Sequence, residues 1–477
     1  MAPKPTLEQS DVVETFTPGD KNLVIEAGAG CGKTSVLKMA ARAVPRRRGL
    51  YIAYNKAIAV EAQKSFPNSV TCKTSHALAF GAVGRRYAHR LNAARMKSED
   101  VAKLTKINNP IYTPTTIIPP AHVARIVMAT VGAFTRSART NILSQPVPRI
   151  PGLDDPETRQ TLAAEIPFLA QKAWQDILDP RGQLPFSHDC YLKIWCLSDP
   201  QLTKYDYILL DEAQDSNPPV AKMVNQQRHA QLVLVGDSSQ ELYGWRGADN
   251  AMAEFDGVRK TLSQSFRFGA AVAEEANVWL EYLNAPLRLR GFDQINSRIT
   301  ELDEPDAILC RTNGTAMAQV MAQLKAGRRV SLVGGGDQIR KLAQAAIQLK
   351  DGRSCSHPEL FAFKNWGELQ DYVEEDEGSD LRPFVNLIDE HGPDIVLATV
   401  SKLVETRFDV EISTGHKAKG REWRRVRVAN DFPEPKPTSD GKPGKISRPD
   451  AMLAYVTVTR AQYELDNSGL SWIHEYM

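Results

Sequence analysis

Short apolar runs alternate with longer amphipathic stretches along most of the chain. The apolar runs are rich in β-branched residues, a pattern typical of parallel strands that are covered on both faces. We predict strands at Asn22–Glu26, Leu50–Tyr54, Tyr207–Asp211, Leu232–Gly236, Ala307–Arg311, Arg329–Val333, Ile395–Val400 and Val426–Asn430. Helices are expected between many of them, for example at Thr34–Val44, which Pro45 would end. The pattern predicts an α/β fold with more than one sheet.

Two stretches depart from this alternation. Residues 80–200 and 341–394 have helical patterns and no clear series of strands, and the second contains the acidic run Glu374–Glu377. Both are predicted to be helical insertions into α/β domains.

Composition limits the class of protein. A chain of 477 residues is long enough for about three domains, and 42% hydrophobic and 24% charged residues are ordinary for a globular protein. No apolar run reaches the ~20 residues of a membrane span, and the first residues lack the apolar core of a signal peptide. We therefore expect an intracellular, cytoplasmic protein (nucleoid-associated if bacterial or phage) with no membrane partner.

Cysteine spacing and net charge do not indicate a particular class of site or partner. The six cysteines form no CxxC pair, so we expect neither a zinc site nor a disulfide framework. A net charge of +2 does not by itself indicate a nucleic-acid-binding protein.

A phosphate-binding loop is predicted directly after the first strand. Small residues there let successive backbone N–H groups surround phosphates, and the dipole of the following helix favours the same charge. Lys33 would reach the β- and γ-phosphates, and Thr34 would hold Mg²⁺. The loop is Ala27-Gly28-Ala29-Gly30-Cys31-Gly32-Lys33-Thr34.

An acidic pair follows the apolar strand that begins at Tyr207. Asp211 would bind Mg²⁺, and Glu212 would position and deprotonate the attacking water. Alone, the run Asp211–Asp215 would also fit an N-cap with an acidic first helical turn. Together with the phosphate loop it predicts an ATP hydrolysis site.

The sequence resembles the UvrD/Rep-like superfamily 1A helicases, whose motifs occur in the same order along this chain. Leu7-Glu8-Gln9 resembles the Q motif, in which the glutamine (Gln9) reads adenine, and the alanine at position 27 is usual in this family. Tyr51–Ala62 and Thr74–Ala79 resemble motifs Ia and Ib, which contact DNA. The DNA-binding residues implied there are Tyr54, Asn55, Lys56, Thr74 and His76.

Motifs III to VI complete the resemblance, at Val235–Ala248, Leu262–Arg267, Thr414–Trp423 and Tyr455–Ala461. The resemblance implies that Gln240 senses the γ-phosphate and that Arg267 and Arg460 are arginine fingers from the second motor domain. Phe266, where tyrosine is usual, would stack on adenine, and Glu422 would meet the nucleotide sugar. The implied DNA contacts are Tyr243, Trp245, Arg246, Thr414 and His416.

Some residues depart from the family pattern. Arg421 replaces a leucine, and Pro449 and Asp450 stand where two glutamates are usual. The segments Tyr51–Ala59 and His188–Lys193 resemble the F-box-containing DNA helicases and their bacterial and phage relatives, although no F-box is evident.

The resemblance implies two RecA-like P-loop motor domains with helical insertions named 1B and 2B. We expect motor domain 1A at 1–79 and 200–257, 1B at 80–199, motor domain 2A at 258–340 and 395–477, and a reduced 2B at 341–394. So small a 2B suggests a compact motor with limited self-inhibition.

The predicted function is an ATP- and Mg²⁺-dependent helicase that moves on single-stranded DNA, 3′→5′ by resemblance, and unwinds duplexes. Its partners would be single-stranded DNA, junctions of single and double strands, and proteins of DNA repair or recombination. Three alternatives stay open: a translocase that mainly displaces recombinase filaments, an RNA helicase, and a P-loop protein that binds ATP without doing work.

Overall fold

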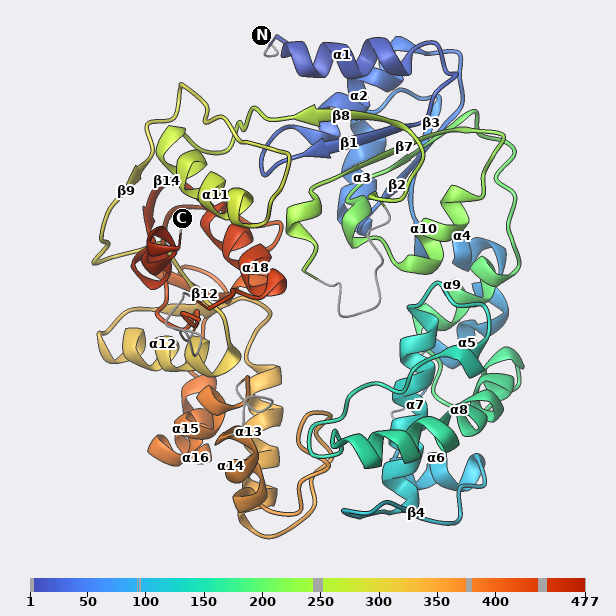
Figure 1. Cartoon of the computed structure of the whole chain (residues 1–477), viewed down its shortest axis with the longest axis vertical. Coiled ribbons are helices and arrows are strands. Elements are labelled where there is room, and N and C mark those ends of the chain that lie inside the picture. Colours follow the sequence, from blue (N-terminus) through green and yellow to red (C-terminus); the bar gives the residue numbers. More distant parts are fainter. Residues whose placement is uncertain are drawn as a thin grey trace. The chain divides into compact units, whose positions relative to one another are not determined.

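The computed structural model describes residues 4–91, 93, 96–242, 252–374, 380–435 and 444–476. The chain divides into two compact units (Figure 1). The first comprises residues 1–26, 33–238 and 243–262, and the second comprises residues 27–32, 239–242 and 263–477. The predicted α/β class is confirmed, since each unit contains a six-stranded sheet with helices around it.

The first sheet has the strand order β3-β2-β6-β7-β1-β8. The pairings β3–β2, β2–β6, β6–β7 and β7–β1 are parallel, and β2, β6 and β7 are buried along their whole length. Burial on both faces explains why these strands have continuous apolar sequences. The strands are β1 (Leu23–Ala27), β2 (Gly49–Ala53), β3 (Val70–Thr74), β6 (Tyr207–Leu210), β7 (Gln231–Gly236) and β8 (Val258–Leu262).

Helices connect these strands. The first begins at a capping box in which Thr6 and Gln9 exchange hydrogen bonds, and Asn55 and Thr74 cap the helices that follow β2 and β3. These helices are α1 (Leu7–Phe16), α2 (Lys33–Ala43), α3 (Lys56–Ser65), α4 (Ser75–Ala82) and α10 (Pro218–Asn225).

Between α4 and β6 the chain is mainly helical, as the sequence predicts. The long helices α7 and α8 pack side by side (Figure 1), and the only strands described there are the two-residue pair β4 (Ile111–Tyr112) and β5 (Ile117–Ile118). The helices are α5 (Ala88–Leu91), α6 (Ser98–Leu104), α7 (Pro120–Thr135), α8 (Pro156–Leu178) and α9 (His188–Leu197).

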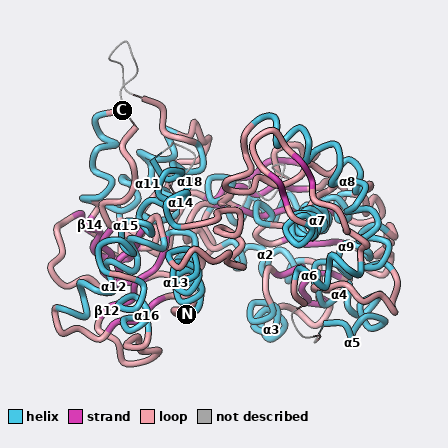
Figure 2. The backbone as a smooth tube through the Cα atoms, turned by 90° about the horizontal axis from the view of Figure 1, so that it is seen from below, coloured by secondary structure: helices cyan, strands magenta, loops and turns pink. Residues whose placement is uncertain are grey.

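The second sheet has the order β11-β12-β10-β13-β14-β9, with parallel pairing throughout. Figure 2 labels two of its strands, β12 and β14, and colours strands magenta. The strands are β9 (Arg298–Ile299), β10 (Ala307–Cys310), β11 (Val330–Leu332), β12 (Val410–Thr414), β13 (Trp423–Val428) and β14 (Ala461–Asp466). Helices of this unit are α11 (Ala270–Tyr282), α12 (Asn313–Lys325), α17 (Gly415–Ala418) and α18 (Arg448–Val458).

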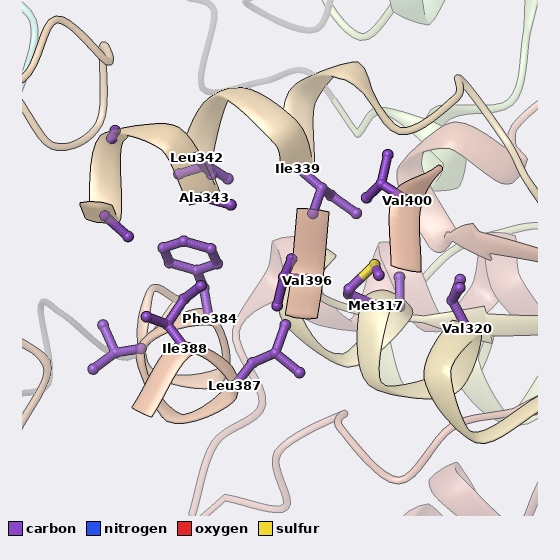
Figure 3. Close-up of a cluster of buried hydrophobic side chains, with 14 of the residues drawn as sticks. Met317, Val320, Ile339, Leu342, Ala343, Phe384, Leu387, Ile388, Val396 and Val400 are labelled. Carbon is purple, nitrogen blue, oxygen red and sulfur yellow. The ribbon is translucent and has the colours of Figure 1, made fainter. Parts of the chain in front are cut away.

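The four helices described between β11 and β12 share one hydrophobic core with the second sheet. Ile308, Val330 and Ile412 from the sheet belong to the same buried cluster as Leu342 and Phe384 from the helices. Figure 3 shows Leu342 and Phe384 in this cluster. The helices are α13 (Asp337–Lys350), α14 (Trp366–Glu374), α15 (Arg382–His391) and α16 (Pro393–Val400). Within the described residues, no helix has the length and apolar character needed to cross a membrane.

The strand predicted at Ile395–Val400 is wrong, because this run forms most of helix α16. Pro393 occupies the first turn, and Val396, Thr399 and Val400 form the buried face at helical spacing while Ile395 is 53% exposed. A short apolar run cannot be assigned to helix or strand by periodicity alone.

The strands β3, β8, β9, β12 and β14 were not predicted from the sequence. Their sequences mix polar with apolar residues, as in Val410-Glu411-Ile412-Ser413-Thr414. The first unit also extends through β8 to Leu262, a few residues beyond the domain boundary expected at 257.

Candidate nucleotide and strand sites

The phosphate loop lies between the end of β1 and the start of α2. Gly30 and Gly32 have φ angles of +75° and +76°, which lie in the left-handed region that glycine adopts without a steric penalty. Cys31, between them, is buried. The loop therefore has the strand, glycine turns and helix that the sequence predicts for binding phosphates.

The acidic pair follows β6 in the first unit, which also contains Lys33 and Thr34 at the start of α2. The Lys33 Nζ atom is 2.8 Å from Glu212 Oε2, and Thr34 Oγ1 is 3.4 Å from Asp211 Oδ2. The structure thus brings together four predicted site residues from distant parts of the sequence.

Glu212 has a strained backbone. Its φ of 50° and ψ of 47° place a residue with a Cβ atom in the left-handed region, at a cost of about 1–3 kcal/mol. Its carboxylate accepts hydrogen bonds from Lys33 and from Gln214 Nε2 at 2.7 Å. This conformation directs the Glu212 side chain toward the residues that end the phosphate loop.

The charges of this cluster are coupled. Burial acts to lower the pKa of Lys33, but the surrounding carboxylates, with Glu212 first, outweigh it and raise that pKa. Burial and the charge of Glu212 raise the pKa of Asp211, whereas Lys33 and a hydrogen bond from Tyr51 lower it. Lys33 therefore stays protonated at neutral pH and compensates the buried carboxylates.

Sequence reasoning assigned no role to Tyr51 or Gln214. The Tyr51 hydroxyl donates to Asp211 Oδ2 at 2.5 Å, and Gln214 accepts from the Asp237 N–H at 3.1 Å as well as donating to Glu212. Tyr51 lies in the interior of β2, where its residue type alone indicates packing. Its hydrogen bond to Asp211 becomes apparent only from the pairing of β2 with β6, the strand that Asp211 follows.

The donors near Asp211 fit a magnesium ion. Mg²⁺ prefers oxygen ligands and usually keeps several waters, so one carboxylate and one hydroxyl from the protein are sufficient with phosphate oxygens. Asp211 and Thr34 supply that pair. Among the described residues, no group of three or more His, Cys, Asp or Glu side chains could hold a metal ion.

In the second unit, two predicted nucleotide-binding residues are in contact. Arg267 Nε lies 2.6 Å from Glu422 Oε2, and Gln462 donates to the other carboxylate oxygen. Arg460 is 1% exposed and donates to the carbonyls of Val456 and Arg421. Phe266 lies next to Arg267, with its ring against Phe292.

The motif V residues lie at the end of β12. The Thr414 hydroxyl accepts a hydrogen bond from the Lys417 N–H and caps α17. His416 follows in that helix, and burial together with the charge of Arg311 lowers its pKa, which favours the neutral imidazole at pH 7.

The remaining predicted residues are placed as follows. Gln9 and Gln240 are both buried, and the amide oxygen of Gln9 accepts from the Thr6 N–H. Tyr54 is 53% exposed, and Asn55 and Thr74 cap α3 and α4. His76 Nε2 is 3.3 Å from Asp189 Oδ1. Tyr243, Trp245 and Arg246 lie outside the described residues.

Comparisons with known proteins agree with these features. Residues 197–256, which include the acidic pair, match the UvrD/REP helicase N-terminal domain. The chain is 29% identical to F-box DNA helicase protein 1 of Schizosaccharomyces pombe and 30% identical to F-box DNA helicase 1 of Gallus gallus. Each alignment covers 96% of this chain, and they cover 57% and 48% of those proteins. The chain thus spans about half the length of these curated relatives.

A solved structure is also similar, at a low level. It is described as Pif1 helicases unwinding forked double-stranded DNA, and it is 12% identical with a TM-score of 0.28. The match covers 67% of this chain and 57% of that one.

Proposed function

We propose that this chain, which is similar to the UvrD/REP-like helicases, is an ATP-dependent DNA helicase that moves along single-stranded DNA. The observation that carries the proposal is the convergence of Lys33, Thr34, Asp211 and Glu212 at the end of the phosphate loop. Those four side chains supply phosphate binding, metal binding and a general base, which ATP hydrolysis requires.

Lys33 and Glu212 have linked roles in the proposed reaction. With ATP bound, the Lys33 ammonium exchanges its contact with Glu212 for the β- and γ-phosphates, and the Glu212 carboxylate is then available to orient and deprotonate water. Gln214 stays hydrogen-bonded to Glu212 and limits its rotation. Thr34 and Asp211 would hold Mg²⁺, which would neutralise phosphate charge when bound.

Arg267 and Arg460 are the proposed arginine fingers. Each guanidinium would stabilise charge that develops on the transferred phosphoryl group, an effect worth about 10³–10⁵ in rate. Arg267 is paired with Glu422, so nucleotide binding must compete with that carboxylate. Arg460 is held by backbone carbonyls, which restrict its orientation. Phe266 and Gln9 are proposed to contact adenine.

Movement on the strand is proposed to follow from nucleotide-dependent changes in DNA contact. Thr414 and His416 would transmit the state of the nucleotide to the strand, and Tyr54, Asn55, Lys56, Thr74 and His76 would hold it. Base stacking tolerates any sequence, which suits a translocating protein. The direction proposed is 3′→5′, as in the family that the chain resembles.

The helices α13–α16, proposed to be a reduced 2B, have no separate hydrophobic core of their own among the described residues. A part that shares its core with a sheet cannot rotate away from it without exposing apolar surface. We therefore propose a compact motor with limited self-inhibition. Robust single-turnover unwinding by the monomer is expected, and a strict requirement for dimers would contradict this proposal.

The central experiment measures ATP hydrolysis with no nucleic acid, single-stranded DNA, duplex DNA and single-stranded RNA. We expect strong stimulation by single-stranded DNA, abolished by Glu212→Gln but retained by Glu14→Gln, which alters an exposed glutamate on α1. Equal rates with and without DNA would leave a plain ATPase, and preferential stimulation by RNA would favour an RNA helicase.

The alternative proposed for the same motor is displacement of recombinase filaments with little unwinding. Unwinding of duplexes with a 3′ or a 5′ tail, compared with removal of a recombinase from single-stranded DNA under the same conditions, separates the two functions and establishes the direction.

A further inference from the structure

A cavity of about 320 Å³ lies in the first unit at the carboxyl ends of β2 and β6. Tyr54 and His76, both predicted to bind DNA, line it together with the first residues of α10. Two further lining residues, Arg136 and Asp189, come from the helices inserted between α4 and β6. Its volume is at the lower end of the range of about 300–1,000 Å³ typical of ligand pockets.

Asp189 links the two basic side chains of this lining. Its carboxylate lies 3.3 Å from His76 Nε2 and 3.8 Å from Arg136 Nη1. The side chains of His76, Arg136 and Asp189 are 41%, 37% and 30% exposed, so a ligand can reach all three.

The segment His188–Lys193, which the proposed ATPase does not use, holds this arrangement. Asp189 lies in the first turn of α9, and Tyr191 packs edge to face against His76 and Phe80. Lys193 is buried and donates to the carbonyls of Ser137 and Arg139, each at 2.6 Å. The backbone on the carboxyl side of Arg136 is thereby fixed to α9.

The contacts of Arg136 differ from those of a structural arginine in the same helices. Arg90 is 5% exposed and makes five hydrogen bonds, to Asp176, Ile177, Asp179 and Leu184. Among the described residues, Arg136 has a single ion pair, and its 3.8 Å separation is too long for a hydrogen bond. The guanidinium of Arg136 therefore keeps donors that can bind an anion from solvent.

We propose that Arg136 binds a backbone phosphate of single-stranded DNA at this cavity, so that the inserted helices complete the strand site begun by Tyr54 and His76. The inference rests on the proposed function. An exposed aromatic ring beside a cationic side chain is the combination that single-strand-binding proteins use, with the ring for a base and the cation for the backbone.

Arg136 is the permanently charged cation in the lining of this cavity, whose carboxylates are those of Asp189, Asp211 and Asp215. Asp211 is hydrogen-bonded to Tyr51, and Asp215 accepts from Gln214 at 3.2 Å, so both are bound within the acidic run and its neighbouring strand. The Asp189 charge is shared between His76 and Arg136. A phosphate at Arg136 gains a charge-assisted hydrogen bond that Asp189 does not make at 3.8 Å.

The test is the affinity of the full chain for an oligo(dT) of about 16 nucleotides, measured by fluorescence anisotropy at several salt concentrations. Arg136→Ala should raise Kd about tenfold and make the slope of log K against log salt shallower by about 0.7, the value for one phosphate contact on a single strand. Arg139→Ala removes the same charge from an exposed residue three positions away, and it should change Kd less than twofold.

The outcomes are distinguishable. If Arg136→Ala has the same Kd and slope as Arg139→Ala, the inference is wrong. Arg136 would then serve only to connect α7 to α9 through its ion pair with Asp189. A tenfold loss of affinity with an unchanged slope would also overturn the inference, since the contact would then be to a base. Thermal melting checks folding, and Arg136→Gln replaces Arg136→Ala if the latter is unstable. Failure of the wild-type chain to bind oligo(dT) would instead contradict the proposed function.

Discussion

Tyr51 has a role that depends on its neighbours in the sheet. Its hydroxyl donates to Asp211, the proposed magnesium ligand, and burial together with Asp211 raises the pKa of the phenol. The phenol therefore remains a donor at all ordinary pH values. A hydrogen bond to a metal-binding carboxylate fixes its orientation, and loss of such a bond typically reduces metal affinity about 10–100-fold.

We expect Tyr51→Phe to raise the Mg²⁺ concentration for half-maximal ATP hydrolysis about tenfold, because Asp211 loses the bond that orients it. Titration of the hydrolysis rate with Mg²⁺ measures this. The matched control is Tyr207→Phe on the adjacent strand, which removes a buried hydroxyl with no hydrogen-bond partner among the described residues. Identical Mg²⁺ curves for the two variants would exclude the role of Tyr51.

At the scale of elements, α16 is the place where the sequence pattern misled. The run Ile395–Val400 is apolar except for Thr399, and such a short run is compatible with either a buried strand or a helix. A helix and a strand formed by this run differ in which side chains are buried. In a strand covered on both faces, Ile395 and Val396 are both buried, whereas in α16 only Val396 is.

Alanine substitution at these adjacent positions distinguishes helix from strand. Val396→Ala should lower the free energy of unfolding by about 2 kcal/mol, because it removes a fully buried side chain from the core. Ile395→Ala should change it by less than about 0.5 kcal/mol. Urea unfolding of both variants measures the difference, and equal losses would contradict the helix.

At the scale of the molecule, each unit has its own sheet, and the second unit includes α13–α16 in the core of that sheet. The buried cluster runs from Ile308 and Ile412 in the sheet to Phe384 in α15 without a boundary. We therefore expect these helices to unfold together with the sheet.

Phe384→Ala should destabilise the second unit by about 3–5 kcal/mol, because a buried aromatic ring is removed from this shared core. Hydrogen exchange should then become faster in β10–β12 and in α13–α16 together. Phe408→Ala, at a 37% exposed phenylalanine in the same unit, is the control and should have little effect. Faster exchange confined to residues 341–394 would indicate an independently folding insertion instead.

Several local features of this protein can be predicted from its sequence. The phosphate loop, the acidic pair and the central buried strands are contiguous segments whose residue types have few alternative uses, so their spacing was sufficient to predict them. The helical character of residues 80–200 and 341–394 was also evident, since helical periodicity needs no distant partner.

Which distant residues come into contact depends on how the elements pack. Strands with mixed polar sequences, such as β12 and β14, exist because parallel neighbours satisfy their backbone, and no local pattern records that pairing. The contacts of Tyr51 with Asp211, and of Asp189 with His76 and Arg136, join positions more than 50 residues apart. Such contacts depend on how strands and helices are placed side by side, which the sequence of one segment does not contain.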